Sequence, residues 1–380
     1  MDRVRLGIVG LGNMGSVHVR ENAPALKRAE LAAICDIVPG KMDPYSNVEK
    51  FRDSRDLIRS GLVDAVLIAT PHYSHTTIGI DAFGNGLHVL TEKPISAHKA
   101  DAMRLISARP EHLVFAAMFQ TRTSGTIQKL RHMVTSGEIG ELRRVNWIVT
   151  NWFRSAAYYA SGGWRATWGG EGGGVLLNQC PHNLDLYQWL FGMPTRIDAF
   201  CGFGKYHDIE VEDTVTAYME HPNGATGVFV TTTGEAPGTD RLEIAGDRGR
   251  VIYENGRIKF DRTVAPVQQF SDTTPDLFPQ LDVWNCEVPG SRHSPSHLEI
   301  IQNFVDSILD GTPLIAPGEE GVRSIELANA MLFSAWTGRT VELPLDASAY
   351  EAALTERIAN SRHRKVVQEQ TASDMTASFH

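Results

Sequence analysis

The first 120 residues alternate between short apolar runs and longer amphipathic segments. Apolar runs of four to eight residues indicate buried strands, and apolar positions three or four apart indicate helices that face a core. We predict strands at 4–10, 31–36, 64–70, 87–94 and 112–119, with helices at 16–28, 74–86 and 96–108 and a further helix that ends at 56–61. This alternation is typical of βαβ units, so we expect a parallel sheet covered by helices on both faces.

The pattern changes after about residue 122, where alternating polar and apolar positions become common. We predict helices at 124–136, 176–191, 297–310 and 319–335, strands at 142–153, 195–203, 213–220, 225–233, 240–246, 249–254 and 257–261, an aromatic, glycine-rich loop at 154–174, and a polar linker at 262–296. Pro222-Asn223-Gly224 and Asn255-Gly256 are hairpin-turn sequences. This part is therefore expected to form an antiparallel or mixed sheet with helices on one face.

Length and composition agree with two domains of an α/β protein. The chain has 380 residues, of which 42% are hydrophobic, enough for two cores. We place an N-terminal dinucleotide-binding domain at 1–123, an α+β domain at 124–345, and a C-terminal segment at 346–380 whose polar tail is predicted to be disordered.

Charge and cysteine usage exclude several classes of protein. The net charge is −9 and no basic run stands out, which argues against a nucleic-acid partner. No stretch approaches the ~18 apolar residues of a membrane span, and the N-terminus lacks a signal-peptide pattern, so we expect a cytoplasmic protein. The four cysteines (Cys35, Cys180, Cys201 and Cys286) are far apart and are interpreted as buried free thiols rather than as zinc ligands or disulfides.

A glycine-rich turn follows the first strand and opens the first helix. It reads Gly10-Leu11-Gly12-Asn13-Met14-Gly15, the GxGxxG pattern of a dinucleotide site. Gly10 permits the tight turn, Gly12 lets the backbone approach a pyrophosphate, and Gly15 lets helix and strand pack closely. Asn13 and Met14 then lie at the helix N-terminus, where backbone N–H groups face the phosphates.

Asp36 ends the second predicted strand, about 20 residues after Gly15, which is where an acid binds the ribose hydroxyls. A carboxylate there would repel a 2′-phosphate, so NAD is favoured over NADP. The alternative is that Asp36 is only a strand-end acid.

Two further motifs lie at strand ends, where ligands of doubly wound sheets bind. Glu92-Lys93-Pro94 ends the fourth strand, and Thr70-Pro71 ends the third, with His72 and His75 just beyond. We expect Thr70, Pro71, His75, Glu92 and Lys93 to border the cofactor. Lys93 is suited to binding a substrate hydroxyl, with its pKa lowered by desolvation, although such a lysine is often only a solvated charge.

A third motif combines Gly172-Gly173-Gly174 with Asn178, His182 and Asp185. If 176–191 is one helix, the last three residues share one face, at i, i+4 and i+7. Imidazole is suited to taking a hydroxyl proton. The alternative is a buried histidine satisfied by Asn178 and Asp185. His297 begins a late helix and either reaches the cleft or serves that helix start.

Together, these motifs resemble the glucose–fructose oxidoreductase, inositol dehydrogenase and rhizopine-catabolism (Gfo/Idh/MocA) family over about residues 3–345. The resemblance implies a Rossmann domain, a second domain with a large open, mostly antiparallel sheet, and a homodimer or homotetramer formed through that sheet. It also implies an NAD(P)-dependent sugar or cyclitol dehydrogenase of the EC 1.1.1 type without a metal. Lys93 maps onto the lysine that binds the reacting hydroxyl, and His182 maps onto the catalytic histidine. Many inositol dehydrogenases have aspartate where this chain has Asn178, which leaves open whether Lys93 or His182 is the base.

The aromatic loop is expected to contact the sugar. Tyr158, Trp164 and Arg165 offer ring faces and forked donors, although a dimer interface or core cluster would have the same composition. We therefore expect NAD-dependent oxidation of a sugar or cyclitol hydroxyl. The alternatives are a keto-sugar reductase, an NAD-retaining glycoside hydrolase or lyase that works by transient oxidation, and a non-catalytic sensor.

Overall fold

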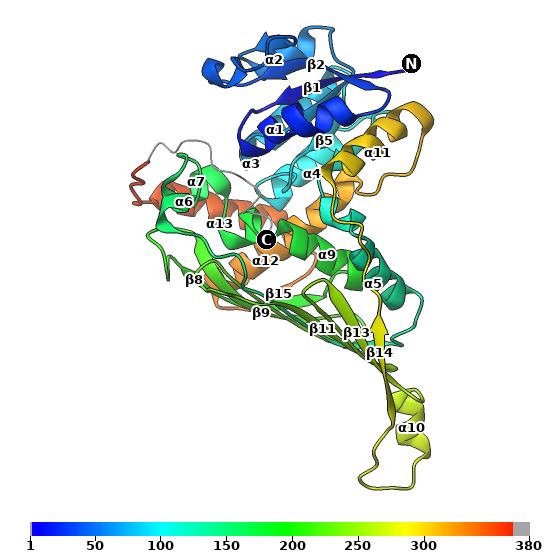
Figure 1. Ribbon diagram of the computed structural model, residues 1–380. Coiled ribbons are helices and arrows are strands. Elements are labelled where there is room, and N and C mark those ends of the chain that lie inside the picture. Colours follow the sequence, from blue (N-terminus) through cyan, green and yellow to red (C-terminus); the bar gives the residue numbers. More distant parts are fainter. Residues whose placement is uncertain (1, 368–380) are drawn as a thin grey trace.

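The computed structural model describes residues 2–367 and contains two β-sheets with helices between them (Figure 1). The first sheet has six strands in the order β3-β2-β1-β4-β5-β6, all parallel. Its strands are β1 (Val4–Val9), β2 (Ala29–Cys35), β3 (Glu49–Phe51), β4 (Ala65–Ile68), β5 (His88–Thr91) and β6 (Phe115–Ala117). The predicted doubly wound sheet is confirmed, with β3 as an additional edge strand.

Apolar strands explain why this sheet is covered on both faces. Every residue of β4 is buried, which is typical of a parallel strand between two helical layers. The helices of this part are α1 (Asn13–Val17), α2 (Ser54–Arg59), α3 (His72–Gly84) and α4 (Lys99–Ser107). The strand order reverses between β1 and β4, so the carboxyl ends of these two strands flank the crevice where such sheets bind ligands.

The second sheet has nine strands in the order β14-β13-β12-β11-β7-β10-β9-β8-β15. β7 and β10 pair in parallel, and the other pairs are antiparallel. The strands are β7 (Leu142–Val149), β8 (Arg196–Phe203), β9 (Glu212–Glu220), β10 (Thr226–Thr232), β11 (Asp240–Gly246), β12 (Gly249–Glu254), β13 (Arg257–Thr263), β14 (Val283–Val288) and β15 (Val341–Glu342). The predicted mostly antiparallel sheet is thereby confirmed.

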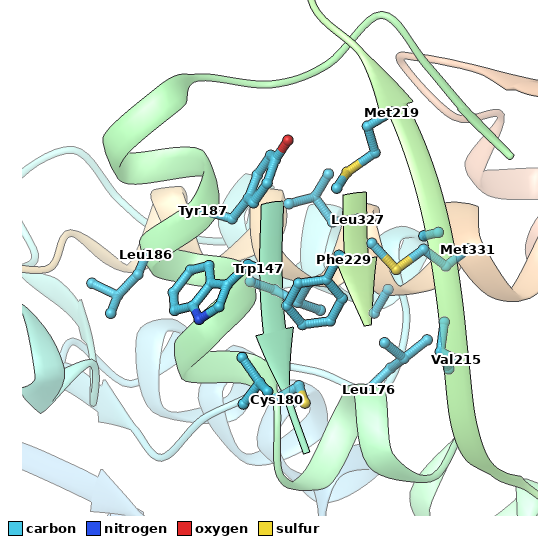
Figure 2. Packing of buried hydrophobic residues seen from close by; sticks show 14 of the residues in the cluster. Trp147, Leu176, Cys180, Leu186, Tyr187, Val215, Met219, Phe229, Leu327 and Met331 are labelled. Atoms are coloured by element: carbon cyan, nitrogen blue, oxygen red, sulfur yellow. The ribbon is translucent and has the colours of Figure 1, made fainter. Parts of the chain in front are cut away.

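One face of this sheet packs against helices and carries the second core. Val145, Trp147 and Val149 of β7 are buried, and the alternate residue Ile148 is exposed on the other face. The covering helices are α5 (Gly125–Thr135), α6 (Ala156–Ala160), α7 (Trp168–Glu171), α8 (Val175–Asn178), α9 (Pro181–Phe191), α12 (Gly321–Thr337) and α13 (Ala347–Asn360). Figure 2 shows side chains of α8, α9 and α12 meeting Trp147 and Phe229 of the sheet.

α11 (His297–Asp310) returns the chain to the first sheet. Ile300, Ile301, Phe304 and Val305 of this helix belong to the core around β1, β4 and β5. The N-terminus of α11 is thereby placed beside the π turn (His18–Asn22) that follows α1, although the two segments are far apart in sequence.

Two predicted segments differ from the structure. The helix expected at 16–28 begins earlier, at Asn13, and passes through a π turn (His18–Asn22) into a 3-10 turn (Ala23–Ala25), where Pro24 has no N–H to continue an α-helix. The linker expected at 262–296 instead contains α10 (Val267–Thr273) and β14, which extend from the body as an arm (Figure 1). β14 was missed because it lies in a polar, proline-containing stretch, and the structure leaves both of its faces largely exposed.

The remaining expectations concern cysteines, membrane spans and the C-terminal tail. All four cysteines are free; Cys35 and Cys180 are buried, and Cys201 and Cys286 are only partly so. Among the described residues, no helix is long and apolar enough to cross a membrane. The tail predicted to be disordered lies mostly outside the described residues, which end at 367.

Candidate active site

The glycine-rich turn forms an open cradle at the end of β1. Gly10 has φ +93, and a side chain there would lie 2.6 Å from the carbonyl oxygen of Ala69. A side chain at Gly15 would overlap the carbonyl oxygen of Gly10, so helix and turn meet only because both positions are glycine. A side chain at Gly12 would meet nothing within 4 Å. The cradle therefore has room for a phosphate group beside Gly12.

Asp36 lies directly against this turn. Its Oδ2 accepts the N–H of Leu11 at 2.7 Å, and its Oδ1 accepts the N–H of Val38 at 2.8 Å. Lys41 approaches the same carboxylate at 3.4 Å. Asp36 thus connects β2 to the turn, as expected of a strand-end acid. It also places a carboxylate beside the cradle, as the prediction of NAD binding requires. Asn13 and Met14 begin α1 at the mouth of the cradle.

Glu92 connects the cradle helix to the strand end that carries Lys93. Its Oε1 accepts His18 Nε2 at 2.8 Å, and its Oε2 accepts the Lys93 N–H at 3.2 Å. Asn22 donates to the other nitrogen of the His18 ring at 3.0 Å. Burial by itself would raise the pKa of Glu92, but the bond and charge of His18, with smaller contributions from His297 and Lys93, hold it at about 2. Glu92 is therefore a buried anion that fixes the backbone of Lys93.

Lys93 bridges the two halves of the molecule. It follows β5, and its Nζ donates to the carbonyl oxygen of Asn178 at 2.9 Å, at the end of α8. Burial lowers the pKa of the ammonium group; the charge of Glu92 opposes this shift and that of Arg165 adds to it. The sequence prediction of a desolvated lysine at the strand end agrees with this geometry.

The Thr70-Pro71 turn lies beside Lys93. His75 is buried with Nε2 2.7 Å from the Thr70 carbonyl oxygen and Nδ1 2.8 Å from that of Pro94, so its ring bridges the loops after β4 and β5. Pro71 precedes α3, and Thr70 Oγ1 has no hydrogen-bond partner among the described residues. This hydroxyl is therefore available to a cofactor lying across the strand ends.

His72 links the same turn to the second half of the molecule. Its Nδ1 lies 3.0 Å from the carbonyl oxygen of Glu171, and its ring lies 5.6 Å from that of Trp164. Burial lowers its pKa to about 3, so the ring is neutral. His72 thus positions the aromatic loop against the first domain.

The helix predicted at 176–191 is interrupted. α8 ends at Asn178, and α9 begins at Pro181, because proline suits the first helical position and disfavours helical angles in the residue before it. The spacing predicted that Asn178 and His182 share one helical face. This prediction is wrong, because the two residues lie on different helices. Asp185 also differs from the prediction, because its two oxygens accept from Arg122 at 2.8 and 2.6 Å instead of supporting His182.

His182 nevertheless faces the cleft at the start of α9. Gln120 Nε2 donates to His182 Nε2 at 3.1 Å, and Nδ1 has no partner among the residues that the structure describes. Burial, followed by the charge of Lys93, lowers the His182 pKa well below its usual value, so the ring is neutral with its proton on Nδ1.

Asn178 is the centre of a hydrogen-bonded cluster. Its Nδ2 donates to Glu171 Oε1, and its Oδ1 accepts from the Tyr158 hydroxyl at 3.1 Å and from Gln179 at 3.0 Å. Burial raises the pKa of Glu171, whose other oxygen accepts the N–H of Ala166 at 2.6 Å. The Glu171 carboxylate is thus hydrogen-bonded directly to the Asn178 amide, whereas the sequence motif showed only the amide.

The aromatic loop brings its three predicted residues to this cluster. The Arg165 guanidinium carbon lies 4.7 Å from the centre of the Tyr158 ring and 4.6 Å from that of Trp164. Its Nη1 donates to the Tyr158 hydroxyl at 2.9 Å. The glycine triplet before α8 serves a different purpose, because Gly174 packs on the backbone of Glu212 rather than facing the cleft.

Several cleft residues escaped the sequence prediction. Glu171 was hidden in a glycine-rich loop and His18 in the first helix. Gln120 comes shortly after β6, and Glu92 comes directly after β5. A polar residue after a predicted strand could therefore have indicated Gln120 as a site residue. His297 was left open; its ring lies 5.7 Å from that of His18, and burial lowers its pKa to about 4. The N-terminus of α11 therefore lies near His18, Glu92 and Lys93.

Known proteins share this arrangement along most of the chain. Residues 4–118 match the model of an oxidoreductase family with an NAD-binding Rossmann fold, and residues 127–252 match the model of the GFO/IDH/MocA C-terminal domain. Myo-inositol 2-dehydrogenase of Thermotoga maritima is 27% identical over 90% of this chain and 98% of its own length. D-glucoside 3-dehydrogenase of Escherichia coli is 26% identical over 90% of this chain and 97% of its own.

A solved structure agrees over both domains. The WlbA dehydrogenase from Bordetella pertussis, crystallised in complex with NADH and UDP-GlcNAcA, superimposes with a TM-score of 0.76 at 27% identity. The match covers 90% of this chain and 100% of that one. With the cradle, the lysine at the strand end and the open mixed sheet in place, the chain belongs to the Gfo/Idh/MocA family of NAD-binding oxidoreductases.

Proposed function

We propose that this protein is an NAD-dependent dehydrogenase that oxidises a hydroxyl-bearing carbon of a sugar, sugar derivative or cyclitol. The observation that carries the proposal is the position of Lys93. It is a partly buried lysine with a lowered pKa, held between the cofactor-binding domain and Asn178, beside a neutral His182. NAD, when bound, supplies the acceptor for a hydride.

The first domain offers the groups that hold the cofactor. The open space beside Gly12 receives the pyrophosphate, and the exposed start of α1, at Asn13 and Met14, lies next to it. Asp36 accepts from the ribose hydroxyls, while Thr70 and Pro71 border the nicotinamide side. The unpartnered Thr70 Oγ1 supports this orientation.

Lys93 is assigned the role of general base. The amine would take the proton of the substrate hydroxyl as the C=O bond forms, and bound NAD would supply the acceptor for the hydride that leaves the same carbon. Burial and the charge of Arg165 favour the neutral amine that this step requires. The bond from Nζ to the Asn178 carbonyl oxygen aims the group at the cleft.

His182 is assigned to hold the substrate oxygen rather than to take its proton. Gln120 already donates to Nε2, so the ring offers the N–H at Nδ1, which has no partner among the described residues. A donor placed there stabilises negative charge that develops on the reacting oxygen. This role is compatible with Asn178, because a donating imidazole needs no charged aspartate behind it.

A polyol substrate follows from the relatives and from the loop. The two curated relatives are named as dehydrogenases of inositol and of glucosides. Tyr158 bonds to Asn178, and Arg165 stacks between Tyr158 and Trp164, so the loop offers ring faces and donors that suit the C–H faces and hydroxyls of a sugar.

We also propose that the protein is cytoplasmic and forms a homodimer or homotetramer through the uncovered face of the nine-stranded sheet. Ile148, Phe200 and Tyr218 are apolar side chains exposed on this face at 38%, 81% and 40%. Light scattering on the purified protein tests the assembly, and a monomer that persists at high concentration would contradict it.

The decisive test is the reduced-nicotinamide absorbance of purified protein with excess NAD and a panel of cyclitols, monosaccharides and glycosides. A rise with one compound establishes the dehydrogenase. Consumption of a glycoside without net NADH would instead indicate an NAD-retaining hydrolase or lyase. If nothing is consumed, the same panel of keto-sugars with NADH separates a reductase from a sensor.

A further inference from the structure

Positive side chains gather at the substrate end of the cleft, although the whole chain carries a net charge of −9. Lys93 and Arg165 act on each other electrostatically, and both act on His72. Lys365 lies close enough to interact with Arg165 and Glu171. The acid within this group, Glu171, is buried and uses both oxygens on Asn178 and Ala166. Glu92 and Glu171 oppose these positive charges from a distance, but neither carboxylate is hydrogen-bonded to the Arg165 guanidinium.

Arg165 is the member of this group that is prepared for a ligand. Its guanidinium lies between the rings of Tyr158 and Trp164, which hold the plane while leaving its edges open. Nη1 donates to the Tyr158 hydroxyl, and no carboxylate of the described residues lies within 4 Å of the group. Within residues 2–367, Nε and Nη2 have no acceptor.

Another arginine of the core shows what a structural role looks like. Arg122 also lies against two aromatic rings, but it is almost fully buried and is paired with Asp185 and Glu320 at 2.6 Å each. Arg165 is only partly buried, which leaves it accessible to a ligand. Arg165 has the aromatic contacts without the carboxylate partners.

The position of Arg165 relative to the reacting atoms is set by a chain of hydrogen bonds. Lys93 Nζ donates to the Asn178 backbone, Asn178 Oδ1 accepts from Tyr158, and the Tyr158 hydroxyl accepts from Arg165. Asn178 and Tyr158 therefore link the two cations through hydrogen bonds and place both at the same cluster.

The C-terminal segment holds this arrangement rigid. Lys365 Nζ donates to the carbonyl oxygens of Gly162 at 2.6 Å and of Arg165 at 2.8 Å. These bonds fix the backbone of a loop that contains two adjacent glycines, Gly162 and Gly163. A binding group held in place before the ligand arrives loses less entropy on binding.

We propose that the substrate is an anionic sugar, whose carboxylate or phosphate group is bound by Arg165 while the hydroxyl to be oxidised lies at Lys93. The inference rests on the proposed dehydrogenase function and names its substrate class. The guanidinium group can bind a carboxylate or a phosphate in the same way, through two parallel hydrogen bonds to its oxygens.

The test compares matched sugars that differ only in the anionic group: a neutral hexose, its uronate and its 6-phosphate, each with NAD. We expect kcat/KM to be at least about 10-fold higher for one anionic member, because a bond to a charged group is worth that much or more. The uronate and phosphate arms identify the anion. This preference should weaken with ionic strength.

Arg165→Gln should remove the preference: the ratio of kcat/KM for the anionic sugar to kcat/KM for the neutral sugar should fall about 10- to 100-fold, whatever the change in the Lys93 pKa does to both rates. Arg131→Gln is the matched control, because Arg131 also stacks on a tryptophan, 3.8 Å from the Trp189 ring, but away from the cleft. Melting temperature and NADH binding of both variants check folding.

Calorimetric titration of the NADH-loaded protein with the same three sugars makes the test independent of turnover. Weaker binding of the anionic sugar to Arg165→Gln than to wild type supports the inference even if no NADH is produced. Equal kcat/KM and equal binding for all three sugars would overturn it, and the dehydrogenase proposal would stand on the turnover alone.

Discussion

The cofactor side and the substrate side of the cleft are built by different means. The cradle comes from one contiguous segment, and its shape depends on backbone conformation and on the lack of side chains at Gly10, Gly12 and Gly15. The substrate side joins β5, the aromatic loop, α8 and α9, and its shape depends on hydrogen bonds between side chains, as at Asn178 and Tyr158. Few sequences can form a site that depends on backbone shape, whereas many combinations of side chains can form a hydrogen-bonded site.

This difference predicts how each side responds to substitution. On the cofactor side, a single methyl group should weaken cofactor binding strongly without changing the fold. On the substrate side, single changes should alter rate, affinity and pH dependence separately.

The largest effect is expected from Lys93→Met, which keeps the length of the side chain and removes the base. The rate should fall about 10²- to 10⁴-fold, the range typical of general acid–base catalysis. Stopped-flow hydride transfer with the substrate found above measures it, and fluorescence titration should show unchanged NADH affinity. Turnover within a few-fold of wild type would reassign the base to His182.

On the cofactor side, Gly12→Ala should weaken NADH binding by more than about tenfold, or ~1.4 kcal/mol, because the new methyl group enters the space left for the pyrophosphate. The unliganded melting temperature should stay unchanged, since the structure has no atom within 4 Å of that position. Gly84→Ala, equally open and remote from the cleft, is the control. Unchanged NADH affinity in Gly12→Ala would place the cofactor elsewhere.

Asp36→Ala should act on the same side with a smaller effect. It removes the carboxylate that accepts from Leu11 and approaches Lys41, so NAD affinity should fall several-fold while discrimination against NADP relaxes. The ratio of kcat/KM for NAD and NADP measures this. A ratio equal to that of wild type would mean that Asp36 serves only the turn.

The smallest effect is a shift in pH dependence on the substrate side. Activity should rise with pH as Lys93 loses its proton, and the lowered pKa of Lys93 extends activity toward neutral pH. Arg165 contributes to that lowering, so Arg165→Gln should raise the Lys93 pKa and move the rise to higher pH. The pH profile of kcat/KM for a neutral sugar measures the shift. A profile that coincides with that of Arg131→Gln would show that the two cations are not coupled.

Much of the first domain could be predicted from the sequence because its signals are local. The alternation of apolar strands with helices, the glycine pattern after β1 and the acid at Asp36 each reflect the stereochemistry of neighbouring residues. Lys93 could be placed at a strand end for the same reason. These features also carried the family resemblance that the comparisons confirm.

Only the tertiary structure decided how the substrate side is assembled. One continuous helix was predicted across Pro181, but a new helix begins at that residue. Asp185 was expected to support His182, but it accepts a hydrogen bond from Arg122 instead. The partners of Lys93 and His182 lie 85 and 62 residues away along the chain. No local pattern encodes such pairs, because they depend on how the open sheet and its helices dock against the first domain.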